Sequence, residues 1–129
     1  MCLLDTVLAW DREHIHCTAS SHRRPTNPLR NGGGLPAVSG VEYAAQAMAL
    51  HASLILEHSA PRAGYLAGLR DLALPVEWLH DIGTDLDIFA TLRASDEGGA
   101  VYDFRLEASD GLLLFGRATV IYSSLGMEP

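Results

Sequence analysis

The chain has 129 residues, of which 48% are hydrophobic and 19% are charged, a profile typical of one folded globular domain spanning residues 1–129. Its formal net charge is −7, which opposes binding to the phosphate backbone of nucleic acids. The one basic cluster consists of Arg23, Arg24 and Arg30. A cluster of this size is typical of a solvated loop, and its functional alternative is a docking patch for an acidic partner.

Cysteine usage and the N-terminal sequence point to a reducing compartment. Cys2 and Cys17 are isolated, so they predict two free thiols and no disulfide framework. The first residues, MCLLDTVLAW, lack the pattern of a secretory signal. The longest apolar run, residues 47–56, is interrupted by His51 and Ser53. We therefore expect a cytoplasmic protein without membrane insertion.

The first half of the chain predicts two strands, a loop and a helix. Residues 4–10 and 14–19 have strand patterns, and the second alternates Ile15, Cys17 and Ala19 on one face. Residues 20–38 contain three prolines and three consecutive glycines, which predict a long loop of the kind that carries function. Residues 41–56 predict a helix that is apolar on every side and therefore buried.

The second half predicts strands over residues 65–74, 76–79, 84–93, 101–107 and 112–123, with a hairpin turn at residues 109–111. An antiparallel sheet that curls around one apolar helix is the simplest arrangement that buries both. The sequence therefore predicts an α+β fold.

Several histidines and the glycine run could have either a structural or a functional role. His14 and His16 form an H-x-H pair, but no third ligand is placed by the sequence, so we predict no metal site. His51 predicts a core histidine with a local partner, His80 has no recognisable partner, and His22 has no fixed place near Glu42. The run Gly32–Gly34 lacks the GK[ST] ending of a phosphate loop and predicts a close backbone approach or a tight connection.

Glu42 is the one carboxylate at the start of the predicted helix. Ser39 and Glu42 have the S-x-x-E spacing of a capping box, in which the glutamate would only bond back to the Ser39 amide. The alternative is an acid or base, because the residue follows a long glycine- and proline-rich loop at the mouth of a buried helix. The local sequence leaves both roles open.

The segment LPAVSGVEYAAQAM resembles the helix start of hot-dog dehydratases that act on 3-hydroxyacyl thioesters of acyl carrier protein. Pro36, Glu42 and Gln46 match a proline, the catalytic glutamate and a glutamine of that family. The resemblance is closest to the dehydratase-like proteins of aryl polyene gene clusters. It implies a hot-dog fold, a curved antiparallel sheet wrapped around one long buried helix. Asn27 lies where the general family has its catalytic histidine.

The resemblance implies formation of an enoyl thioester without metal or cofactor. Glu42 would be catalytic, and Asn27 would orient water or the substrate hydroxyl. Substrate would be bound by Pro36, Ser39, Gly40, Val41 and Gln46, with free amides around Gly40 and Val41 for the thioester oxygen.

The implied partners are acyl carrier protein with its acyl-phosphopantetheine and a second hot-dog subunit, in a homodimer or a heterodimer. Two alternatives remain, a noncatalytic or half-active subunit of a heterodimeric dehydratase and a hot-dog acyl thioesterase.

Overall fold

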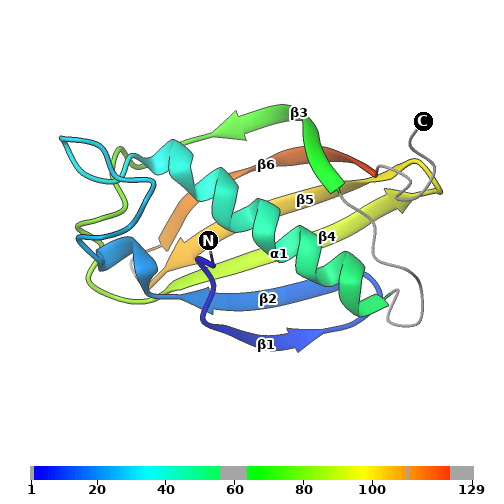
Figure 1. Cartoon of the computed structure of the whole chain (residues 1–129), viewed down its shortest axis with the longest axis horizontal. Coiled ribbons are helices and arrows are strands. Elements are labelled where there is room, and N and C mark those ends of the chain that lie inside the picture. Colours follow the sequence, from blue (N-terminus) through cyan, green and yellow to red (C-terminus); the bar gives the residue numbers. More distant parts are fainter. Residues whose placement is uncertain (1, 56–63, 110, 123–129) are drawn as a thin grey trace.

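A computed structural model of the chain describes residues 2–55, 64–109 and 111–122. These residues form a six-stranded antiparallel sheet and one long helix, which confirms the predicted α+β hot-dog fold (Figure 1). The strands lie in the order β1-β2-β4-β5-β6-β3. The elements are β1 (Thr6–Trp10), β2 (His14–Ala19), α1 (Gly40–Ile55), β3 (Gly64–Ala73), β4 (Leu86–Ser95), β5 (Gly99–Ala108) and β6 (Gly111–Tyr122).

The strands follow the alternation of their sequences. On β2, Ile15, Cys17 and Ala19 are buried while the residues between them are more exposed, as predicted. β4 and β5 bury every second residue over most of their length, and their buried faces point toward the helix. The predicted strand ends differ from the observed ones by a few residues, and residues 56 and 123 lie outside the described part of the chain.

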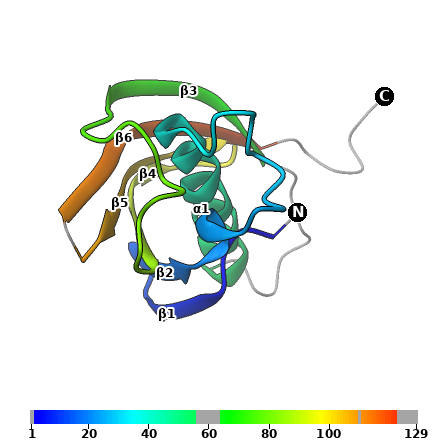
Figure 2. The same cartoon turned by 90° about the vertical axis from the view of Figure 1, so that its left-hand side faces the viewer.

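The helix α1 lies across the concave face of the sheet, and the view along its axis shows the strands curving around one side of it (Figure 2). Its buried side includes Tyr43, Ala44, Ala47 and Met48. Its other side is less covered, and Ala49 and Ser53 are exposed. The prediction of a helix buried on every side is therefore wrong for this chain by itself, because the sheet encloses only one side.

Two loops meet at the end of the molecule where α1 begins (Figure 1). The amide of Leu79 donates to the carbonyl oxygen of Leu35 at 2.8 Å, and the amide of Ala37 donates to that of Glu77 at 3.0 Å. The strand predicted over residues 76–79 is wrong. Its apolar residues form one isolated bridge, Pro36 with Trp78, because they pair with a short loop segment and not with a sheet edge.

The sheet has two unequal edges. β1 has 5 residues and β3 has 10, and each pairs with a single neighbour in the described sheet. Within the described residues, no helix is long and apolar enough to cross a bilayer.

Candidate active site

Glu42 lies in the first turn of α1 and is half-buried. The hydrogen bonds and ion pairs of the described residues include none to its carboxylate. The capping box is not formed, because the amide of Ser39 already donates to the carbonyl oxygen of Pro36 at 3.0 Å. A 3₁₀ turn, Ala37–Ser39, runs directly into α1 with Pro36 as its cap. The predicted helix cap at Ser39 is therefore wrong, and the Glu42 carboxylate is left available.

The start of α1 is pressed tightly against the sheet at Gly40. A Cβ added to Gly40 would lie 2.2 Å from Leu114 Cδ2 and 3.1 Å from Leu106 Cδ2. The amide of Gly40 donates to the carbonyl oxygens of Ala37 and Val38, so it is not the free donor that we expected at this position. Val41 follows as a buried residue.

Asn27 is held in a buried hydrogen-bond network around Tyr43. Its Nδ2 donates to the carbonyl oxygen of Ser21 at 2.9 Å and to the Tyr43 hydroxyl at 3.0 Å, and its Oδ1 accepts from the Leu29 amide at 2.8 Å. Ser21 Oγ lies 2.7 Å from the Tyr43 hydroxyl and donates to the carbonyl oxygen of Leu3 at 2.8 Å. Burial raises the pKa of Tyr43. Both amide protons of Asn27 are thus used inside the protein.

Gln46 lies one helical turn after Glu42, so the two side chains share a face of α1. Gln46 Oε1 accepts from the amide of Leu3 at 2.8 Å and ties the N-terminal segment to the helix. The structure therefore brings Pro36, Ser39, Gly40, Val41 and Glu42 together at the start of α1. It places Gln46 beside the N-terminal segment and Asn27 beside Tyr43.

Sequence reasoning missed Tyr43 and Ser21, and the expectation that His80 has no partner is wrong, because the Leu35 amide donates to His80 Nδ1 at 2.9 Å. The only local signal was that Tyr43 and His80 are polar aromatic residues within apolar stretches, which need a partner when they are buried.

Two histidines are fixed away from Glu42. His22 is fully buried and its Nε2 lies 3.0 Å from the carbonyl oxygen of Ile82, so it is not free to swing toward Glu42. His51 is also fully buried, which confirms a core histidine. Its partners are not local, because Nε2 lies 2.8 Å from the carbonyl oxygen of Asp11 and Nδ1 lies 2.8 Å from the Tyr102 hydroxyl. The carbonyl can only accept, so Nε2 donates and Nδ1 accepts.

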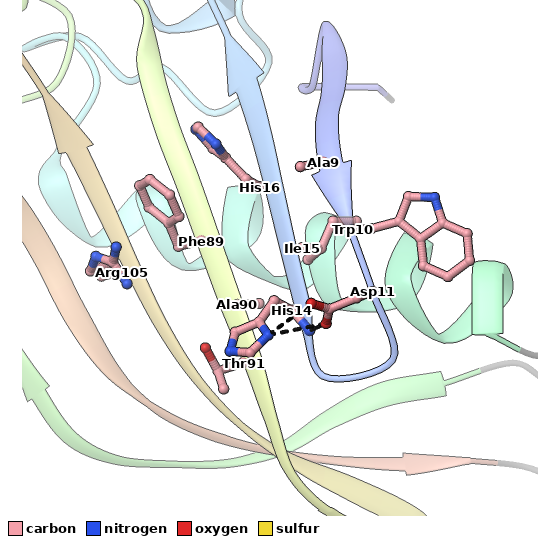
Figure 3. Close-up of a pocket in the computed structure, with 10 residues that line it drawn as sticks. All are labelled: Ala9, Trp10, Asp11, His14, Ile15, His16, Phe89, Ala90, Thr91 and Arg105. Atoms are coloured by element: carbon pink, nitrogen blue, oxygen red, sulfur yellow. Dashed lines mark hydrogen bonds and ion pairs between the residues drawn. The ribbon is translucent and has the colours of Figure 1, made fainter.

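The H-x-H pair lines a shallow pocket of about 210 Å³ on the outer face of the sheet, away from α1 (Figure 3). His14 Nδ1 lies 3.0 Å from Asp11, and His16 Nε2 lies 2.8 Å from Asp87. The ring of His16 stacks on Phe89 at 4.1 Å. Among the described residues, no three His, Cys, Asp or Glu side chains are grouped to hold a metal.

The three arginines of the basic cluster lie in the loop before α1. Arg23 donates to the carbonyl oxygen of Gly83 at 2.9 Å and to Asp85 at 2.8 Å. Arg30 Nε donates to the carbonyl oxygen of Arg24 at 3.3 Å. Arg23 therefore braces the neighbouring loop, and its charge is paired with that of Asp85.

The cysteines have the expected free state. Cys2 is exposed and Cys17 is buried, and burial raises the pKa of the Cys17 thiol to about 11. Cys17 is therefore a packing residue of β2 and not a nucleophile at neutral pH.

An apolar helix laid across a curved six-stranded antiparallel sheet defines the chain as a hot-dog protein. The chain belongs to the ApeP-like family, the ApeP dehydratases, which it matches over residues 1–126. Among curated proteins, none matches the sequence.

Solved structures agree with this family. A chain of the dehydratase heterocomplex ApeI:P from Xenorhabdus doucetiae has a TM-score of 0.84 and 25% identity, covering 96% of this chain and 84% of that one. A thioesterase from Haemophilus influenzae has a TM-score of 0.68 and 15% identity, covering 95% of this chain and 79% of that one. A thioesterase variant from Pseudomonas aeruginosa has a TM-score of 0.64 and 17% identity, covering 92% and 81%. The two thioesterases support the fold alone.

Proposed function

We propose that the chain takes part in dehydration of a 3-hydroxyacyl thioester carried by acyl carrier protein. The observation that carries this proposal is the Glu42 carboxylate, which lies in the first turn of α1 without a polar partner among the described residues. The reaction removes the proton beside the thioester carbonyl and protonates the departing hydroxyl, giving an enoyl thioester and water. Glu42 supplies one of these proton transfers.

The second proton transfer needs another titrating group. Asn27 does not titrate, and both protons of its side-chain amide are already donated to Ser21 and Tyr43. These contacts favour a positioning role for Asn27 over a catalytic one. A homodimer would have Asn27 at this position in both copies, so it would not supply the second titrating group.

We therefore propose a heterodimer in which a related hot-dog subunit brings the missing base to Glu42. The ApeI:P heterocomplex, to which this chain is similar, supports this arrangement. In such a heterodimer the chain is a half-active subunit that supplies Glu42 to a shared site, and the alternative is a noncatalytic subunit of the same heterodimeric dehydratase.

Carrier protein docking would use the basic cluster formed by Arg23, Arg24 and Arg30. The chain has a net charge of −7, so an acidic carrier needs a local basic surface, and this cluster in the loop before α1 can supply it. The substrate would then approach the start of α1, where Pro36, Ser39 and Val41 line its path. We place this reaction in the cytoplasm.

Purified protein should be assayed alone and after co-expression with a hot-dog subunit that carries histidine at the position equivalent to Asn27. The substrates are 3-hydroxyacyl and saturated acyl thioesters on carrier protein. Enoyl product from the pair supports the proposal, whereas release of free acid and thiol supports the thioesterase alternative. Absence of both products would overturn an enzymatic role.

Glu42→Gln tests the central residue. Glutamine keeps the size and the hydrogen-bonding reach but does not ionise, so turnover of the active assembly should fall roughly 10²- to 10⁴-fold. The melting temperature should hardly move, because the carboxylate has no polar partner among the described residues to lose. Glu13→Gln, at an exposed site in the β1–β2 turn, is the matched control and should leave turnover unchanged. A Glu42→Gln protein with wild-type turnover would remove Glu42 from the chemistry.

A further inference from the structure

The glycine run before α1 forms a tight turn against two aromatic side chains. The amide and carbonyl groups of Asn31 and Gly34 exchange hydrogen bonds at 2.9 and 3.0 Å, and Asn31 Oδ1 accepts from the Gly33 amide at 3.0 Å. A Cβ on Gly33 would lie 3.1 Å from the Trp78 ring. The Trp78 and His80 rings meet edge to face, with centroids 5.3 Å apart. The turn is thus seated on this aromatic pair.

Gly34 is the point of closest approach. Its φ is +123°, a conformation that favours glycine, and an added Cβ would lie 2.2 to 2.8 Å from three atoms of the His80 ring. Gly32 has nothing within 4 Å of such a Cβ. The requirement for glycine therefore belongs to position 34 and not to the run as a whole.

His80 accepts a hydrogen bond from the chain that Gly34 places above it. The Leu35 amide donates to His80 Nδ1 at 2.9 Å, so Nδ1 is the acceptor and Nε2 is the ring nitrogen that carries the proton. Leu35 is fully buried, and an amide at this depth needs an acceptor. His80 is the only side chain that fills this need among the described residues.

Further hydrogen bonds connect Leu35 to the segment that begins α1. Leu35 accepts from the amide of Leu79, and Ala37 donates to the carbonyl oxygen of Glu77. Ala37 opens the 3₁₀ turn that runs into α1, and Gly40 then fixes the helix against Leu114. The position of His80 is thus linked by consecutive hydrogen bonds to the turn that presents Glu42.

We propose that His80 is a positioning residue for the reaction, acting through a Gly34–His80 lock in which the ring sits under Gly34 and holds the Leu35 amide. The lock fixes the start of α1 and with it the carboxylate of Glu42. This inference rests on the proposed dehydration. The lock itself is a property of this chain and can be measured without substrate.

The first experiment measures amide hydrogen exchange by NMR in wild type, His80→Ala and His80→Asn. Removing the ring should speed exchange at the Leu35 amide at least tenfold. Exchange at the Ala37 and Leu79 amides should also become faster, because the hydrogen bonds between residues 35–37 and 77–79 would weaken. Asparagine places an oxygen near the position of Nδ1, so His80→Asn should restore protection. Faster exchange at Leu35 alone, or equal exchange in His80→Ala and His80→Asn, would overturn the lock.

The second experiment measures turnover of the active assembly. His80→Ala should lower kcat roughly 10- to 100-fold with a smaller change in KM, because misplacement of the acid affects the chemical step more than binding. His80→Asn should recover most of kcat. If wild type itself shows no turnover, the proposed function fails while the exchange result still decides the lock. Wild-type kcat in a His80→Ala protein would overturn the positioning role.

A double-mutant cycle tests whether Gly34 and His80 act together. Gly34→Ala should lower the melting temperature and kcat strongly in the wild-type background, but less in the His80→Ala background, where the ring no longer opposes the new methyl group. Gly32→Ala is the matched control and should resemble wild type in both measurements. Additive effects of Gly34→Ala and His80→Ala would contradict the lock.

Discussion

The imidazole of His22 is fully buried between two loops. Its Nε2 donates to the carbonyl oxygen of Ile82, and its Nδ1 has no hydrogen-bond partner among the described residues. Burial lowers the pKa of His22, because the charged ring would lose water and this loss outweighs its hydrogen bond to the carbonyl oxygen of Ile82. The folded protein therefore keeps this ring neutral at a pH where an unfolded chain protonates it.

This difference predicts a loss of stability on mild acidification. The unfolded histidine takes up a proton near pH 6.5, and the folded one does so only at a lower pH, so the free energy of unfolding should fall as pH drops below about 6.5. Asp11 and Asp103, whose pKa values are lowered by hydrogen bonds to the Glu13 amide and to Arg117 respectively, titrate at more acidic pH. We expect the melting temperature to fall between pH 7 and pH 5.

His22→Gln isolates this effect, because glutamine can still donate to Ile82 but does not titrate. The melting temperature of this variant should depend less on pH in the same range. An unchanged slope in His22→Gln would show that other groups cause the pH dependence.

At the level of the element, α1 and the sheet meet most closely at Gly40. Gly40→Ala should improve helix propensity by about 1 kcal/mol, but its methyl group would overlap the fully buried Leu114 side chain. Overpacking of this kind typically costs 1–3 kcal/mol, so we expect a net loss of stability or a shifted helix.

Chemical denaturation of Gly40→Ala, Leu114→Ala and the double variant measures this contact. The double variant should be less destabilised than the sum of the single ones, since the smaller side chain leaves room for the methyl group. Gly68→Ala, in β3, has open space around the added Cβ and serves as the control. Additivity would mean that α1 is not held by this contact.

The elements were predictable from sequence to the extent that their signals were local. Alternation identified β2, and the long alanine- and leucine-rich run identified α1. The S-x-x-E spacing failed because Pro36 starts the helical path earlier and its carbonyl already occupies the Ser39 amide. The partners of Asn27 and His80 could not be predicted, because Tyr43 and Leu35 reach them only through tertiary folding.

At the scale of the whole molecule, the long strand β3 forms one edge of the sheet and pairs only with β6 among the described strands. β3 carries large exposed apolar side chains, including Tyr65, Leu66 and Leu69, whose relative solvent-accessible surface areas are 58%, 37% and 38%. A long apolar edge strand is normally covered by another strand, because its unpaired backbone groups would otherwise invite aggregation. β3 has 10 residues and is such an edge, whereas β1 at the other edge has only 5. Ala49 and Ser53, on the side of α1 that faces away from the sheet, are also exposed among the described residues and could contact a neighbouring subunit. We therefore expect β3 to pair with the edge of a second hot-dog subunit.

Leu69→Lys tests this assembly by placing a charge on the β3 edge. If the edge is an interface, the charge should weaken association roughly 100-fold, because it would lose water without a partner. Light scattering at micromolar concentration, on the chain alone and with the co-expressed subunit, would detect this as a shift toward monomer. Leu8→Lys, on β1, is the matched control, since Leu8 is 55% exposed on the other edge and should tolerate lysine. If Leu69→Lys associates as tightly as wild type, or if Leu8→Lys dissociates instead, the interface does not lie on β3 and the missing base must reach Glu42 by another route.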